Sequence, residues 1–182
     1  MKTRLGFLVA ALALLTHTVA AQSAGRKDVQ VFQDVSAAVN RYVYFTIFDD
    51  VSARVHNGEV TLTGKVTLPY KSDEIQKRVA KVDGVTRVVN QISVLPVSGF
   101  DDELRYRIAR SIYGNPNFWN YAVMINPPIH IVVERGRVTL TGVVQSEVDR
   151  VLARALAMQF GAMSVKNDLK TQEEVRNQLE TS

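Results

Sequence analysis

The chain has 182 residues, of which 46% are hydrophobic, and a formal charge of +4. It contains no cysteine, which excludes disulfide bonds, thiolate metal ligands and a cysteine nucleophile. Lys2 and Arg4 supply half of the excess charge, and the remaining +2 is too small for the clustered basic face of a nucleic-acid binder.

The N-terminus has the pattern of a secretory signal peptide over residues 1–21. Lys2 and Arg4 precede an apolar run from Leu5 to Leu15, and small residues continue to Ala21. The run is shorter than the ~20 residues that span a bilayer, and we expect cleavage after Ala20 or Ala21. No cysteine follows to carry a lipid anchor, so we expect a periplasmic protein that is not a lipoprotein.

The next segment has the pattern of a small α+β module. Apolar residues spaced four apart predict a helix over 35–46: Val35, Val39, Val43 and Ile47. Alternation from Val51 predicts a strand, and Asn57-Gly58 predicts a two-residue hairpin turn, because both turn positions need positive φ. Pro69 suits the start of a second helix that ends near Gly84, and a last strand is expected over 86–94.

The module occurs twice. Residues 57–64 recur as residues 135–142, an offset of 78, with six of eight positions identical. The second copy predicts a helix over 101–113, a hairpin over 129–144, a helix over 146–160 and a strand over 165–171. We therefore predict an α+β fold of two tandem αββαβ domains, each a three-stranded sheet with two helices on one face. The expected boundaries are 28–95 and 100–171, with a linker at 96–99 and a polar tail at 172–182 that is able to form a short helix.

The repeated motif resembles the BON domain of bacterial envelope proteins. The matching residues are Gly58, Val60, Leu62, Gly64, Gly84, Val85, Val88 and Asn90 in the first copy, and Gly136, Val138, Leu140, Gly142, Gly161, Val165 and Asn167 in the second. Ala162 departs from the valine of the pattern. The resemblance implies non-catalytic work at the envelope, namely binding of phospholipid surfaces or of unfolded and partner proteins, often under osmotic or membrane stress.

Most of the motif residues have structural explanations. We expect Gly58 and Gly136 to serve turns, Gly84 and Gly161 to end helices, and Gly64 and Gly142 to mark a bend or the close approach of a helix. Asn90 and Asn167 are expected to satisfy local backbone groups. Capping is expected for Asp101-Asp102 and solvation for Asp49-Asp50, while His130 is expected at the surface or between the domains.

Catalytic and metal-binding patterns are missing from the sequence. Beyond the signal peptide the histidines are His56 and His130, and no His-x-x-x-His, Gly-x-Ser-x-Gly or phosphate-loop motif occurs. We expect no enzyme activity, no cofactor, no metal and no small-molecule substrate.

The second copy carries about ten extra residues between its first helix and its hairpin. Residues 115–128 concentrate Phe118, Trp119, Tyr121 and Met124 between prolines. Aromatic side chains in a loop often bind partners or lie at a membrane interface. The alternative is that the loop seals the interface between the two domains, which we favour because exposed apolar patches are rare on soluble monomers.

Basic residues on the second helix of each copy are a further candidate for contact with anionic lipid. They are Lys77, Arg78 and Lys81 in the first copy and Arg150 and Arg154 in the second. Polybasic lipid sites usually carry four to eight such residues, so a solvated face is expected unless both helices and the insertion act together. Two hypotheses follow: binding of anionic phospholipid surfaces or envelope proteins, and a periplasmic holdase chaperone for unfolded clients.

Overall fold

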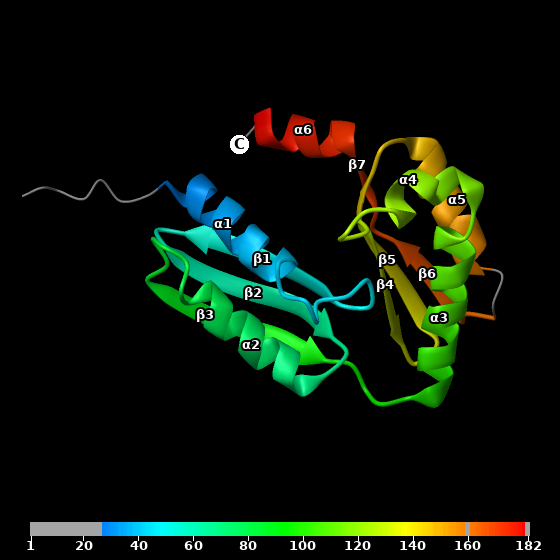
Figure 1. Ribbon diagram of the computed structural model, residues 1–182, viewed down its shortest axis with the longest axis horizontal. Helices are drawn as coiled ribbons and strands as arrows, with labels where there is room; N and C mark the ends of the chain where they lie inside the picture. Colours follow the sequence, from blue (N-terminus) through cyan, green and yellow to red (C-terminus); the bar gives the residue numbers. More distant parts are fainter. Residues whose placement is uncertain (1–26, 159–160, 181–182) are drawn as a thin grey trace, which may run out of the picture.

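The computed structural model describes residues 27–158 and 161–180. The signal peptide predicted over 1–21 lies outside the described residues. Two α+β domains stand side by side, and residues 95–98 connect them (Figure 1). Domain 1 runs from α1 to β3, and domain 2 runs from α3 to α6.

Domain 1 is a three-stranded mixed sheet with two helices on one face. Its elements are α1 (Asp28–Asn40), β1 (Asp50–His56), β2 (Glu59–Val66), α2 (Pro69–Val79) and β3 (Arg87–Val94). The central strand β2 pairs antiparallel with β1 and parallel with β3. The core lies between sheet and helices and includes Val31, Val35, Leu62 and Ile75, each fully buried.

The first helix lies earlier than its pattern predicted. It spans 28–40 rather than 35–46, and Val43 is 82% exposed. The apolar spacing of four extends backward to Val31, and the chain turns away after Asn40 so that Tyr42 enters the core in place of Val43. The predicted turn is confirmed, since Asn57 and Gly58 have φ of 50° and 75°.

Domain 2 repeats this plan and adds elements at the insertion and at the C-terminus. Its elements are α3 (Gly99–Tyr113), η1 (Pro116–Phe118), α4 (Trp119–Ala122), β4 (Ile129–Glu134), β5 (Arg137–Val144), α5 (Glu147–Ala157), β6 (Ser164–Asn167), β7 (Lys170–Thr171) and α6 (Gln172–Glu180). The strand predicted over 165–171 is divided into β6 and β7, both parallel to β5. The polar tail forms α6, where Thr171 and Glu174 hydrogen-bond each other's backbone N–H groups as a capping box.

Residues 45–49, which precede β1, join the two domains. The backbone N–H of Ile131 on β4 donates to the carbonyl of Ile47 at 2.7 Å. The rings of Phe48 and Tyr106 meet edge-on with centroids 5.0 Å apart. His130 was expected either at the surface or between the domains, and it lies between them. Its Nδ1 is 2.6 Å from the Asp49 carbonyl oxygen, so Nδ1 carries the hydrogen of that bond.

Asp49 was expected to be solvated and is instead fully buried. Its carboxylate accepts hydrogen bonds from the backbone N–H groups of Thr46 and Thr67 and from Lys71 Nζ. These bonds fix the segment that contacts domain 2. The prediction failed because Lys71 lies 22 positions away in sequence, on the first turn of α2.

Candidate functional site

The insertion of domain 2 divides into a buried half and an exposed half. Phe118 is fully buried and Tyr121 is 3% exposed, and both belong to the core of domain 2. Trp119 and Ile125 are 67% and 98% exposed. The insertion therefore seals its own domain rather than the domain interface, which residues 45–49 close. Residues 125–128 only border a groove of about 560 Å³ opposite Phe45 and Ile47.

Tyr121 anchors the insertion to α5. Its hydroxyl accepts from the backbone N–H of Gln145 at 2.7 Å and donates to the carboxylate of Asp149 at 2.8 Å. Burial, followed by the contacts with Asp149, raises the pKa of Tyr121 to about 12, so the hydroxyl keeps its proton at neutral pH. The two hydrogen bonds of Tyr121 therefore fix the position of the insertion that carries Trp119 and Met124.

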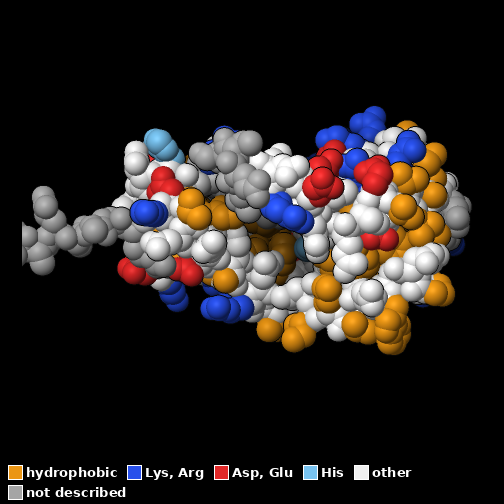
Figure 2. Space-filling view, turned by 90° about the horizontal axis from the view of Figure 1, so that it is seen from above, with side chains coloured by type: hydrophobic (Ala, Val, Ile, Leu, Met, Phe, Trp, Pro, Cys, Tyr) orange, Lys and Arg blue, Asp and Glu red, His pale blue; other side chains and the backbone are white. Residues whose placement is uncertain are grey.

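The exposed face of α5 is apolar. Val148, Val151 and Met158 are 73%, 58% and 55% exposed, and Ala155 lies on the same stripe at helical spacing. Hydrophobic side chains gather at this end of the molecule in the space-filling view (Figure 2). We call the exposed part of the insertion together with this stripe the apolar surface of domain 2: Trp119, Val123, Met124, Ile125, Val148, Val151, Ala155 and Met158.

The equivalent helix of domain 1 shows that the fold does not require this surface. Helices α2 and α5 have the same length, and their buried positions match at an offset of 78, with Ile75 equivalent to Ala153 and Val79 to Ala157. At the same offset the stripe positions Val151 and Ala155 correspond to Asp73 and Lys77. The apolar stripe is thus specific to domain 2.

The structure does not bring the predicted basic residues together. Helices α2 and α5 lie on different domains and well apart (Figure 1). Lys77 is paired with Glu74 at 2.8 Å, while Lys81 is exposed in the turn that follows α2. Arg150 pairs with Glu147 and with Glu174, which fastens α6 to α5. Arg154 is exposed beside the apolar stripe, and no ion pair among the described residues includes it.

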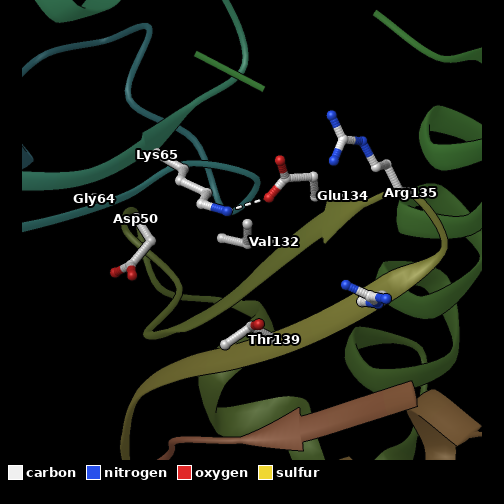
Figure 3. A pocket seen from close by; sticks show the side chains of 8 residues that line it. Asp50, Gly64, Lys65, Val132, Glu134, Arg135 and Thr139 are labelled. Atoms are coloured by element: carbon white, nitrogen blue, oxygen red, sulfur yellow. Dashed lines mark hydrogen bonds and ion pairs between the residues drawn. The ribbon is translucent and has the colours of Figure 1, made fainter. Parts of the chain in front are cut away.

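A groove of about 410 Å³ lies between the two domains, at the far end of β4 from the insertion. Lys65 of β2 extends across it to an ion pair with Glu134 of β4 (Figure 3). Arg135, Arg137 and Thr139, from the β4–β5 hairpin, complete the domain 2 wall. The groove was not predictable from the sequence, because Lys65 and Glu134 on its two walls are 69 positions apart along the chain.

The described residues hold no group of three or more His, Cys, Asp or Glu side chains placed to bind a metal ion. Across the ranges 27–158 and 161–180, no helix combines the length and the apolarity that crossing a membrane needs.

Comparison with known families identifies both domains. The family model described as the BON domain matches residues 27–96 and 120–173. The chain belongs to the BON domain family. BON domains are non-catalytic binding domains that are generally linked to the membrane and envelope.

Two solved structures are distantly similar to this dual-BON protein. One is a structure of CdsD, a structural protein of the type III secretion system of Chlamydia trachomatis, with 13% identity, TM-score 0.30, and coverage of 81% of this chain and 97% of that one. Another is the C-terminal domain of CdsD, with 17% identity, TM-score 0.34, and coverage of 81% and 69%. No curated protein matches the sequence significantly.

The residues of the BON motif serve the fold. Gly84 and Gly161 have φ of 86° and 75°, but they do not end the helices as expected: α2 and α5 end at Val79 and Ala157, and the glycines lie in the segments that follow. Gly64 and Gly142 are also at positive φ, but the atom that approaches them is the carbonyl oxygen of Asp50 or Pro128, at the start of the neighbouring strand, and not a helix. Asn90 and Asn167 donate from Nδ2 to Ser72 on α2 and to the Arg150 carbonyl on α5, which fastens each closing strand to a helix.

Two aspartates have equivalent roles in the two BON domains. Asp28 on α1 accepts from the backbone N–H groups of Asn57 and Gly58, and Asp101 on α3 accepts from those of Arg135 and Gly136. Capping was the expected role of Asp101. The structure shows that Ser98 caps the helix and that Asp101 holds the hairpin turn.

Proposed function

We propose that this dual-BON protein is a periplasmic adaptor that docks on anionic phospholipid through the apolar surface of domain 2. The observation that carries the proposal is the exposed stripe Val148, Val151, Ala155 and Met158 on α5. Domain 1 has the charged residues Asp73 and Lys77 at the two central positions of this stripe. Apolar patches of this kind on a folded domain mark contact with a membrane or a partner.

The chemistry of the surface suits the interface of a bilayer. Burial of a large apolar side chain contributes about 1.5–3 kcal/mol, and tryptophan combines a large ring with a polar N–H that prefers the headgroup region. Arg154 adds about 1 kcal/mol near an anionic surface. Apolar burial therefore dominates, and the preference for anionic over neutral lipid should be modest and sensitive to salt.

Co-sedimentation with vesicles tests the proposal. The mature chain should pellet with phosphatidylglycerol vesicles at low salt. The double variant Val151→Asp/Ala155→Lys places the domain 1 residues Asp73 and Lys77 on α5, so the fold should tolerate it while vesicle binding falls roughly tenfold. Tyr70→Ala, at the domain 1 position equivalent to Val148, is the matched control and should bind as the parent does. If the mature parent chain stays in the supernatant, the lipid proposal is wrong.

A holdase chaperone is the second candidate. Three exposed methionines favour it, because flexible thioether side chains suit varied apolar partners: Met124, Met158 and Met163. Suppression of the aggregation of a denatured client in the absence of lipid would support this function. The Val151→Asp/Ala155→Lys variant should weaken the suppression if the client occupies the same surface.

The periplasmic location is part of the proposal and rests on the N-terminal pattern of Lys2, Arg4 and the apolar run. Fractionation of expressing bacteria should release the protein with the periplasmic contents. Its N-terminal residue should then be Ala21 or Gln22. A full-length chain in the cytoplasmic fraction would contradict export.

A further inference from the structure

The groove between the domains presents two arginines without acidic partners. Among the described residues no ion pair includes Arg135 or Arg137, whereas Lys65 is neutralised by Glu134. Thr139 adds a hydroxyl, and Asp50 is the other acid in the lining. The three cations outnumber the two acids, so the groove favours an anion.

Arg135 occupies a backbone position that does not favour arginine. Its φ is 52°, in the left-handed region, where the equivalent Asn57 of domain 1 has φ 50°. Turns of this type prefer asparagine or aspartate at that position, because their short side chains tolerate positive φ. A residue that breaks a local rule of the fold is a candidate for a functional role.

The second arginine also departs from the repeat. Position 137 corresponds to Glu59 of domain 1, so domain 2 has exchanged an acid for a base on the first residue of the returning strand. Both changes add positive charge at the same groove. The wall that carries them is fixed, since the Asp101 carboxylate is 1% exposed and accepts from the N–H groups of Arg135 and Gly136 at 2.7 Å.

We propose that this interdomain groove binds a phosphate group through Arg135 and Arg137, with Lys65 and Thr139 in support. Guanidinium groups form paired hydrogen bonds with phosphate oxygens, and two of them around a tetrahedral dianion engage more donors than a planar carboxylate accepts. The proposal does not rest on the membrane function, because the groove is at the other end of β4 from the insertion. The phosphate belongs to a small molecule or to a lipid headgroup.

Calorimetric titration of the mature chain with inorganic phosphate and with glycerol phosphate tests the site. The parent should bind with saturation, and Arg135→Asn/Arg137→Glu should lower the affinity at least tenfold. These substitutions are the residues that domain 1 carries in its own hairpin, so the variant should fold normally, with a melting temperature no lower than that of the parent. Arg54→Asn, on the exposed face of β1, removes a positive charge elsewhere and should leave binding unchanged.

A vesicle arm identifies the source of the phosphate. In the Val151→Asp/Ala155→Lys background, any remaining pelleting with phosphatidylglycerol vesicles should disappear on adding Arg135→Asn/Arg137→Glu if the group is a lipid headgroup. Either a titration or a vesicle signal that depends on the two arginines supports the proposal. It is overturned if neither signal appears or if the arginine variant binds as tightly as the parent. Loss of this site would leave docking by the apolar surface of domain 2 intact, so the two proposals fail separately.

Discussion

The carboxylate of Asp49 and the ammonium group of Lys71 lie 2.6 Å apart in the interior of domain 1, with side chains that are 0% and 5% exposed. The same carboxylate holds residues 46–49, whose backbone contacts β4. Domain 2 has a corresponding contact made by different residues. Asp149, which is equivalent to Lys71 in the repeat, accepts a hydrogen bond from Tyr121. In each domain the first turn of the second helix fixes the segment before the hairpin.

Breaking the Asp49–Lys71 pair should be costly. Lys71→Met leaves a buried carboxylate without its cation and should lower the free energy of unfolding by about 3–5 kcal/mol. The double variant Asp49→Asn/Lys71→Met removes both charges and should recover part of that loss. Urea denaturation of the three proteins measures the effect. Equal stability of Lys71→Met and the parent would show that the pair contributes nothing.

The same pair predicts a dependence on pH. Burial raises the pKa of Asp49, but the hydrogen bonds from Lys71, Thr67 and Thr46 outweigh it, so that the pKa lies below its usual value of 3.8. A lowered pKa contributes stability that is present above the unfolded value and is lost as the pH falls through the folded one. The parent should therefore keep its stability from pH 7 to about 5 and lose it below about pH 4.

In Lys71→Met, burial of Asp49 is no longer offset by a cation. Protonation then relieves the unpaired charge, so the stability deficit of this variant relative to the parent should shrink as the pH falls from 6 to 3. Urea midpoints at several pH values measure it. A deficit that stays constant over this range would show that Asp49 does not titrate in response to Lys71.

Asp101→Ala should destabilise domain 2. The substitution removes the buried carboxylate that accepts from the N–H groups of Arg135 and Gly136, which should cost about 1.5–3 kcal/mol. Asp28→Ala, the equivalent change in domain 1, should cost less because solvent reaches that turn. Thermal unfolding of both variants provides the comparison, and equal losses would argue against the role of burial.

Tyr121→Phe should loosen the insertion while its ring still fills the same space in the core of domain 2. The ring is kept, but the Gln145 N–H loses its acceptor and Asp149 loses a donor, at a cost of about 1–3 kcal/mol. Limited proteolysis should then cut faster within residues 119–128. Trp119→Ala is the contrasting variant: its exposed ring should affect vesicle binding and leave the cutting rate unchanged.

The repeat and the turn residues made most of the fold predictable. Asn57-Gly58 and its copy located both hairpins, and the offset of 78 located the second domain because each element contacts neighbours close in sequence. The end of α1 was not predictable, since no glycine or proline follows Asn40 and Val43 continues the spacing of its apolar residues.

The candidate site was predictable only in part. Trp119 and Met124 were found because aromatic and apolar residues in an insertion stand out in sequence. The ion pair of Arg150 with Glu174 was not predictable, because Glu174 lies 24 positions away in the polar tail. The interdomain groove depends on Lys65 and Glu134, which no local pattern connects.

The hydrogen bond from Ile131 to Ile47 has a consequence for the order in which the chain folds. Strand β4 is at the edge of its sheet, and an uncovered edge is a template for pairing with other chains. Residues 45–49, which cover this strand, are synthesised before it. A folded domain 1 therefore has its contact segment ready when β4 emerges, whereas domain 2 produced alone would have a bare edge and should aggregate at concentrations where the whole chain stays in solution.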